Sequence, residues 1–288
     1  MQRQVPLSVL VAAKNEERNI GRCLQALQWA EQVVVVDSSS TDRTARIASE
    51  MGREVVQFAY AGSYPKKRQW ALDHVAWRHP WVLLLDADEE VTPALAEEIA
   101  RVLDRVDRVG YFVLKQFHFL GRRLRFGGFS HSALILLRRG GARFEAVTGS
   151  DASGLDMEVH ERLIVGGATA RLAQPLVHHD FKGLAAYVDR HNRYSTWEAH
   201  VRRQMKRGVH GEDRVRARPW GDVQERRRFL KRIAMSLPFE PWLWFCYHYV
   251  LRLGFLDGRR GLVAAQLRRA YIEQVRAKLY EMQLAEGR

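Results

Sequence analysis

The sequence predicts an α/β fold: a mostly parallel sheet flanked by helices, followed by a helical, basic C-terminal extension. Three observations in the 288 residues support this prediction. Short apolar runs alternate four times with segments of helical spacing. The runs are apolar throughout, which is typical of parallel strands covered on both faces. Of a formal net charge of +13, residues 187–288 contribute most, with 22 Lys and Arg against 11 Asp and Glu.

The first hundred residues supply the alternating strands and helices. Each expected strand is a short apolar run, and each expected helix shows apolar residues three or four positions apart or opens on a capping residue or proline. The expected strands are 8–12, 32–36, 54–58 and 81–85; the expected helices are 18–29, one from near residue 41, 66–76 and one opened by Thr92-Pro93.

After residue 110 the pattern changes to shorter β-like pieces separated by glycine pairs, which predicts an antiparallel or mixed extension of the sheet. A loop over the site is expected at 145–157. We therefore expect one domain at residues 1–204 and a helical extension at 205–288. The expected later strands are 111–117, 124–126 and 133–137, and the expected later helices are 184–204, 226–252 and 261–284.

Polar residues follow three of the expected strands. Ligands of such sheets bind beyond the carboxyl ends of the strands, and here those ends carry Lys14-Asn15-Glu16, Asp37 and Asp86-Ala87-Asp88. No G-x-G-x-x-G or G-x-x-x-x-G-K-[ST] follows the first strand, which disfavours a dinucleotide site and a P-loop. A sugar-nucleotide pyrophosphorylase is disfavoured because the glycine-rich basic loop it needs is missing from the same place.

The Asp86-x-Asp88 pair directly follows an apolar strand. Two carboxylates at a strand end can hold a divalent cation such as Mn²⁺ or Mg²⁺, which stabilises the charge on a departing diphosphate. A phosphatase of the D-x-D-x-[TV] type would need Thr or Val where the chain has Glu90. The alternative is a solvated loop with acidic residues at a helix N-terminus, an interpretation that fits Glu89 and Glu90.

Asp37 lies where a carboxylate can accept hydrogen bonds from a base or ribose edge, so we expect it to contact a ligand. Asp42 and Thr44 follow closely, and for these two residues we prefer helix capping.

The segments VLVAAKNEERNIGRCLQAL, VVVVDSSSTDRTARIA, KKRQWAL and WVLLLDADEEV, in this order and spacing, resemble family 2 glycosyltransferases of the GT-A fold. The bacterial branch acting on lipopolysaccharide core or exopolysaccharide glycans is the most similar, and GFLDGRRGL near the C-terminus also recurs there. The resemblance spans about residues 5–200. It implies a GT-A catalytic domain, a nucleotide-sugar donor (a UDP-sugar in the first instance), and a glycolipid or polysaccharide-precursor acceptor.

The resemblance also implies roles for single residues. Asp37 would contact the nucleoside, Asp88 would bind the metal, and Asp86 would face ribose or a metal-bound water. Arg68 would lie near the donor phosphates, although Gln69-Trp70 stands where the family often has Asn after the Arg. The expected nucleotide-sugar-binding residues are Ala12, Asn15, Glu16, Asp37, Arg68, Asp86 and Ala87, and the expected metal ligands are Asp88, Asp86 and His160.

An inverting sugar transfer needs a carboxylate that takes the proton of the acceptor hydroxyl. The candidates are Asp156, Glu158 and Glu161, and Glu161 is preferred because this chain keeps the Val-His-Glu motif of the resembled branch. The alternative is a charged rim strand. Candidates for a further metal ligand opposite Asp88 are His160, His178, His179 and Asp180, with a hydrogen-bonded structural histidine as the alternative.

The C-terminal third contains an Arg-rich segment, 226–232, followed by an aromatic run at 237–251. The run falls short of the roughly 20 clean apolar residues of a membrane span. Its aromatic residues and flanking arginines suit a lipid interface, so we expect a monotopic anchor on the inner face of the cytoplasmic membrane. A core helix is the alternative. The aromatic residues of this anchor are Trp242, Trp244, Tyr247 and Tyr249.

Nucleic-acid binding also fits the charge, but the aromatics cluster in one apolar run and no recognised nucleic-acid motif is present. We therefore expect no nucleic-acid partner. The remaining alternative to an enzyme is a non-enzymatic basic α/β module that binds nucleic acid or an anionic membrane.

Overall fold

The computed structural model describes residues 4–61, 64–145, 163–179, 183–206, 218–220 and 223–286. Within them the chain forms two compact units. Unit 1 takes the described residues up to Arg123, Ser130–Phe144 and residues 163–179, and unit 2 takes Leu124–Phe129 and the described residues from Gly183 onward. The sequence-predicted boundary after residue 204 thus falls inside α5 (Gly183–Lys206).

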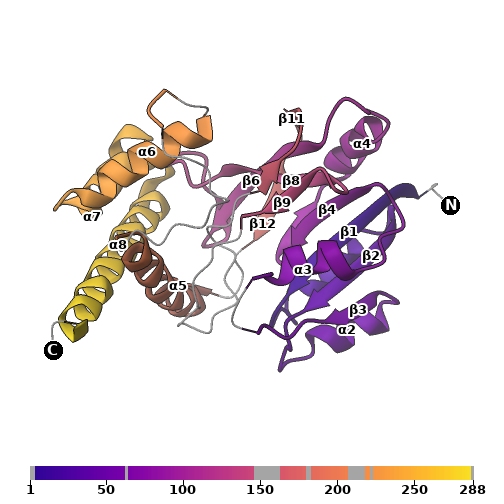
Figure 1. The fold of residues 1–288 in the computed structure, drawn as a ribbon, viewed down its shortest axis with the longest axis horizontal. Helices are drawn as coiled ribbons and strands as arrows, with labels where there is room; N and C mark the ends of the chain where they lie inside the picture. The colour runs from indigo at the N-terminus through magenta and orange to yellow at the C-terminus, as the bar shows by residue number, and fades with distance from the viewer. Residues whose placement is uncertain are drawn as a thin grey trace. The chain divides into compact units, whose positions relative to one another are not determined.

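Unit 1 is built on one large sheet in the strand order β3-β2-β1-β4-β8-β6-β12-β5, with β7 and β11 also paired to β6 (Figure 1). A separate two-stranded sheet joins β9 and β10. The strands are β1 (Val5–Ala13), β2 (Ala30–Asp37), β3 (Glu54–Gln57), β4 (Trp81–Asp86), β5 (Glu89–Val91), β6 (Gly110–Phe119), β7 (Arg122–Arg123), β8 (His131–Arg138), β9 (Ala142–Phe144), β10 (Leu163–Val165), β11 (Thr169–Arg171) and β12 (Leu176–His179).

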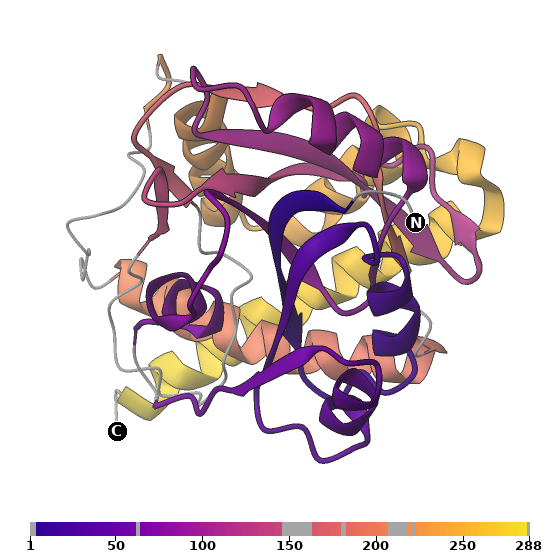
Figure 2. The ribbon, with the colours of Figure 1, turned by 90° about the vertical axis from the view of Figure 1, so that its right-hand side faces the viewer.

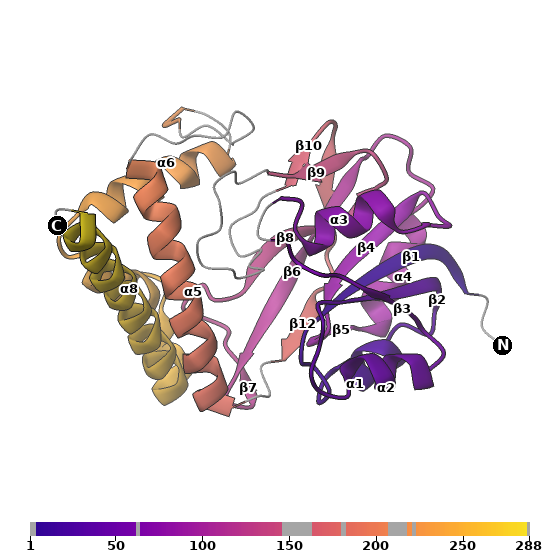
Figure 3. The ribbon, with the colours of Figure 1, turned by 60° about the horizontal axis from the view of Figure 1, so that its bottom comes forward.

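The four predicted strands of the first half are confirmed, and they pair in parallel. Figure 3 shows α3 on one side of these strands and α1 and α2 on the other, as expected for strands that are apolar on both faces. The side chains of β1, β2 and β4 form the centre of the core. The helices of unit 1 are α1 (Ile20–Gln25), α2 (Thr44–Glu50), α3 (Lys67–His74) and α4 (Pro93–Val102).

The other half of the sheet is mixed, as the sequence predicted. Strand β8 runs antiparallel to both β4 and β6, whereas β12 runs parallel to β6 and antiparallel to β5. The α/β class is therefore confirmed. Six short strands, β5, β7, β9, β10, β11 and β12, were not predicted, because two to four residues are too few for a periodic pattern.

Unit 2 is helical, with α5 and α8 lying side by side along much of their length (Figure 2). The predicted helices at 184–204 and 261–284 are confirmed by α5 and α8. The further elements of the unit are α6 (Val223–Ser236), α7 (Glu240–Cys246), a π-helical turn η1 (Tyr247–Leu251), a 3₁₀ turn η2 (Gly254–Asp257) and α8 (Gly258–Glu286).

Two predictions of secondary structure are wrong. The single helix expected at 226–252 is broken between α6 and α7, where Pro238 has no N–H to donate to a helical carbonyl. The strand expected at 124–126 is a loop. The backbone N–H groups of Arg125 and Phe126 donate to the carboxylate of Asp257, at 3.1 and 2.8 Å, instead of to a neighbouring strand.

His248 links this loop to the helices of unit 2. Its Nδ1–H donates to the Gly127 carbonyl at 2.6 Å, and its ring stacks on Phe129 at 4.8 Å. Burial lowers the pKa of His248 from 6.5 to about 4, with smaller contributions from Arg268 and Arg252, so the ring is neutral in the folded protein at neutral pH.

The protein is expected to lose stability as the pH falls below 6.5, because the unfolded chain then takes up a proton at His248 that the folded chain refuses until about pH 4. The loss at pH 4 is about 3 kcal/mol. Thermal unfolding of the parent and of His248→Asn, which retains a donor for Gly127, checks this across the same pH range. A parallel decline of both proteins would contradict the assignment.

Candidate active site

The carboxyl ends of β1, β2 and β4 meet at one edge of the sheet. In register, Ala13 pairs with Asp37 and Ala12 pairs with Asp86. The Ala87 N–H continues the contact by donating to the Ala12 carbonyl at 3.1 Å. Three of the predicted donor-binding segments therefore lie side by side, as parallel strands require.

The loops after β1 and β2 are bonded to each other. Asn15 adopts a left-handed backbone conformation, and its Oδ1 accepts from the Thr41 N–H at 2.8 Å. The Glu16 N–H donates to Thr44 Oγ1 at 2.7 Å. Asp42 accepts from the Thr44 N–H at 3.0 Å at the start of α2, whereas the N-cap residue itself is Arg43, which makes no side-chain capping bond. These bonds fix the shape of the edge around Asp37.

Asp37 itself is buried at the end of β2, with 1% of its surface exposed. Its carboxylate accepts from the N–H of Ser40 at 2.9 Å and from the Ser40 hydroxyl. The side chain is thus held at the sheet edge by its own loop, at the place where the sequence predicts contact with a nucleoside.

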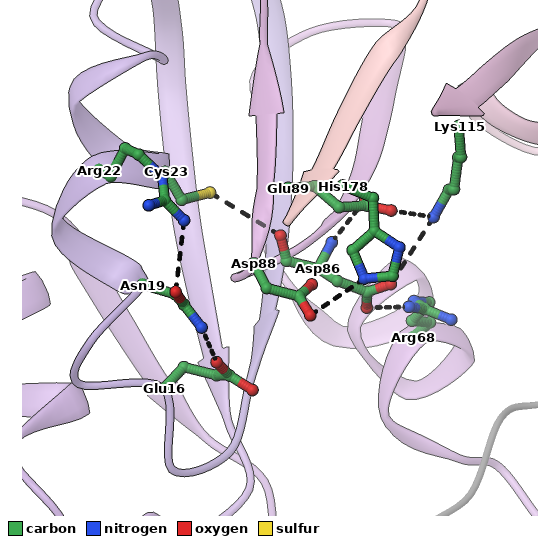
Figure 4. A network of polar contacts seen from close by, with 10 residues as sticks. All are labelled: Glu16, Asn19, Arg22, Cys23, Arg68, Asp86, Asp88, Glu89, Lys115 and His178. Atoms are coloured by element: carbon green, nitrogen blue, oxygen red, sulfur yellow. Dashed lines mark hydrogen bonds and ion pairs between the residues drawn. The ribbon is translucent and has the colours of Figure 1, made fainter. Parts of the chain in front are cut away.

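Asp86 is held between two cations (Figure 4). Its carboxylate forms an ion pair with Nη2 of Arg68 and lies 3.6 Å from Nζ of Lys115. Burial by itself raises the pKa of Asp86, but the charges of Arg68 and Lys115 hold that pKa well below its ordinary range. Asp86 is therefore ionised, and the structure places Arg68 directly on this carboxylate.

Glu89 stabilises the same turn through two contacts. Its Oε2 accepts from the Asp86 N–H at 3.0 Å, and its Oε1 lies 2.5 Å from Nζ of Lys115. Burial raises the pKa of Glu89, against the opposing charge of Lys115. Only 2% of Glu89 is exposed, so its interpretation as a solvated residue is wrong: the β5–β12 pairing covers it.

Lys115 was missed by sequence reasoning. Burial lowers the pKa of a lysine, but the carboxylates of Glu89 and Asp86 raise the pKa of Lys115 above its ordinary value. The one available signal was a lysine directly after the apolar first half of β6. Because lysine is rarely buried without a partner, such a residue marks a carboxylate nearby.

Asp88 points toward His178 (Figure 4). Its Oδ2 lies 3.1 Å from Nε2 of His178, which β12 carries beside β5. Burial lowers the pKa of a histidine, but the carboxylate of Asp88 raises the pKa of His178 to about 9. Among the described side chains, His178 is therefore the named histidine that the structure places against Asp88.

The Asp88–His178 pair can hold a divalent metal once the imidazole of His178 has lost its proton, because histidine ligates a metal only in its neutral form. One carboxylate oxygen and one imidazole nitrogen at hydrogen-bond distance form a donor set that suits Mn²⁺. The part of the chain that the structure describes contains no group of three or more His, Cys, Asp or Glu that could hold a metal. The pair thus fits an ion that takes its other ligands from phosphate and water. Asp86, by contrast, is already paired with two cations.

The predicted catalytic base falls outside the described residues. The predicted metal ligand His160 and the further candidate Asp180 also fall outside them. For the candidate His179 only the backbone is described. The residues concerned are Asp156, Glu158, Glu161, His160, His179 and Asp180.

The chain matches Glycosyl transferase family 2 over residues 8–148, which include all the strand-end residues described above. The chain carries a family 2 glycosyltransferase domain. The predicted family and the prediction of a glycosyltransferase enzyme are therefore confirmed, and the alternative of a non-enzymatic basic module is wrong, because this domain is that of an enzyme.

Relatives of this glycosyltransferase extend beyond the matched domain. The lipopolysaccharide core biosynthesis glycosyltransferase LpsC of Rhizobium meliloti (strain 1021) is 27% identical over 297 residues, 99% of this chain and 96% of LpsC. An uncharacterized glycosyltransferase of Rickettsia bellii (strain RML369-C) is 36% identical over 94 residues, 32% of this chain and 31% of that protein. Among solved structures, Staphylococcus aureus TarS 1-349 aligns with 97% of this chain and 92% of that chain, at 16% identity and a TM-score of 0.46.

Proposed function

We propose that this enzyme transfers a sugar, with inversion, from a nucleotide-sugar, in the first instance a UDP-sugar, to a glycolipid or polysaccharide-precursor acceptor of the cell envelope. The acceptor would be presented at the inner face of the cytoplasmic membrane. The similarity to LpsC along nearly the whole of both chains supports a role in lipopolysaccharide core synthesis. The observation that carries the proposal is the Asp88–His178 pair just past the carboxyl end of β4, at the sheet edge where β2 also ends in Asp37.

Each group has a task in this reaction. Asp37 accepts hydrogen bonds from the nucleoside, and Asp88 and His178 hold the metal. When bound, a divalent metal stabilises the negative charge that develops on the leaving diphosphate. Arg68 and Lys115 keep Asp86 ionised and fix the turn between β4 and β5.

The chemical step itself needs a base. The acceptor oxygen forms a bond to the anomeric carbon as the bond from that carbon to the diphosphate breaks. We assign Glu161 as the general base that accepts the proton of the acceptor hydroxyl, with Glu158 and Asp156 as the remaining candidates. The nucleoside diphosphate leaves on the opposite face, so the configuration inverts.

Glu161→Gln is expected to retain donor binding and to lose turnover by roughly 10²–10⁴-fold, because the amide cannot accept the proton. Release of nucleotide in a donor screen measures turnover, and stabilisation of the fold by nucleotide plus Mn²⁺ measures binding. Glu158→Gln and Asp156→Asn are the matched controls. Full activity of Glu161→Gln together with an inactive control would move the base to that residue, and a parent with no transferase activity towards any donor would overturn the proposed function.

A further inference from the structure

The helical segment from Glu240 to Leu251 in unit 2 buries polar side chains and exposes apolar ones. Its inward face carries Glu240, fully buried, and His248, 8% exposed. Its outward residues recur at spacings of three and four, and every one of them is apolar. We call these residues the outer stripe: Phe239, Trp242, Leu243, Cys246, Tyr247, Val250 and Leu251. A surface helix of a soluble protein normally has the opposite arrangement.

Buried charges hold the segment in this orientation. Both oxygens of Glu240 accept from the guanidinium of Arg202, at 2.8 and 2.9 Å, and Arg202 is also paired with Glu198 at 2.8 Å. His248 is fixed by its bond to the Gly127 carbonyl. Turning the segment to bury the outer stripe would separate Glu240 from Arg202, and breaking a buried ion pair in this way is costly.

The exposed apolar area continues past the outer stripe. The next turn, which packs against η1, exposes three more large side chains. Monomeric soluble proteins rarely expose so many neighbouring apolar side chains without a partner. These additional residues are Leu253, Phe255 and Leu256, each between 44% and 53% exposed.

Arginines accompany this surface. Arg252 and Arg259 are exposed beside it, and the Arg269 guanidinium lies 4.3 Å from the Trp242 ring centroid. Residues 223–286 hold twelve Lys and Arg against six Asp and Glu. Of those acidic residues, Glu240 and Asp257 are engaged in contacts inside unit 2.

We propose that the outer stripe and the turn after it form a docking surface for an anionic lipid bilayer. The apolar side chains would enter the boundary between headgroups and acyl chains, and the arginines would contact lipid phosphates. No described helix is long and apolar enough to cross a membrane, so the segment would lie in the interface. A second copy of this chain is disfavoured as the occupant, because a two-fold interface would bring the arginines of both copies into the same contact.

The structure changes which aromatic residues are available for this contact. Of the four named from the sequence, Trp242 and Tyr247 are exposed. Trp244 instead stacks on His248 at 5.6 Å, and Tyr249 stacks on Phe245 at 5.3 Å. The lipid-facing set therefore gains Phe239, Val250 and Leu251 in place of the two packed rings.

The test is co-sedimentation of the full chain with vesicles of phosphatidylethanolamine and phosphatidylglycerol, and with vesicles of phosphatidylcholine alone. The parent is expected to bind the anionic vesicles more tightly. The double variant Phe239→Glu/Leu251→Glu is expected to lower that binding at least about tenfold. The matched control is Tyr280→Glu/Leu284→Glu, two large side chains on α8 that are 63% and 54% exposed, and it is expected to bind as the parent does.

Three results would overturn the proposal: a parent that ignores anionic vesicles, equal losses in both double variants, or a parent dimer that Phe239→Glu/Leu251→Glu converts to a monomer. The proposed function explains why such a surface is useful, but vesicle binding is measured without any sugar donor. Stabilisation by nucleotide plus Mn²⁺, recorded on the same proteins, is expected to be unchanged by the double variant. Vesicle binding therefore tests the docking surface, and stabilisation by nucleotide plus Mn²⁺ tests the proposed function, so that one can fail without the other.

Discussion

Replacing Asp88 by Asn is expected to lower sugar transfer by roughly 10²–10³-fold, the scale of losing one electrostatic stabiliser of a transition state. The amide keeps the shape of the side chain but removes the charge that a divalent metal needs. Because Asp88 makes its described polar contact with His178, the substitution leaves the Asp86–Lys115–Glu89 cluster intact. The fold should therefore survive, and the stabilisation that requires both nucleotide and Mn²⁺ should disappear.

Glu90→Gln is the matched control for this experiment. Glu90 lies two residues away on β5 and forms an ion pair with Arg22 at 3.7 Å, with about a third of each side chain exposed. Exposed pairs of this kind contribute little to stability, so transfer and metal-dependent stabilisation should stay close to those of the parent. If Asp88→Asn behaves like Glu90→Gln, the metal is not held at Asp88.

His178→Ala gives an independent reading of the same site. If Asp88 and His178 hold one ion together, the double variant should be hardly worse than either single variant, because each removes the same function. If the fold-losses of transfer activity of the two single variants multiply in the double variant, the two residues act separately.

The sequence was informative where structure is determined locally. The four apolar strands are long enough to show their pattern, and parallel pairing brings their carboxyl ends together. Asp37, Asp86 and Asp88 could therefore be placed at one edge of the sheet from the sequence alone. The bond from the Thr44 N–H to the Asp42 carboxylate at the start of α2 follows from the same local chemistry.

Contacts between segments that are distant in the sequence could not be predicted from it. Asp88 and His178 are 90 positions apart and meet only because the short strand β12 pairs with β5 and β6. The polarity of the 240–251 segment is a similar case. Its aromatic composition is plain in the sequence, but which rings face outward depends on the buried contact between Arg202 and Glu240, 38 positions apart.

Lys115→Met is expected to destabilise unit 1 by about 3–5 kcal/mol, the usual result of removing one partner of a buried ion pair. The substitution keeps the apolar stem but removes the ammonium that lies 2.5 Å from Glu89 and 3.6 Å from Asp86. Since Glu89 is almost fully buried, its carboxylate would be left with the Asp86 N–H as its one described polar contact. Chemical denaturation followed by circular dichroism measures the loss.

The double variant Lys115→Met/Glu89→Gln distinguishes a charge effect from loss of packing. The amide introduced by Glu89→Gln still offers a carbonyl oxygen to the Asp86 N–H, and it carries no charge that needs a cation. If Lys115 acts by neutralising Glu89, the double variant should be more stable than Lys115→Met alone, although it carries one more substitution in the core. A double variant as unstable as the sum of the two single variants would show instead that Lys115 does not act by neutralising Glu89.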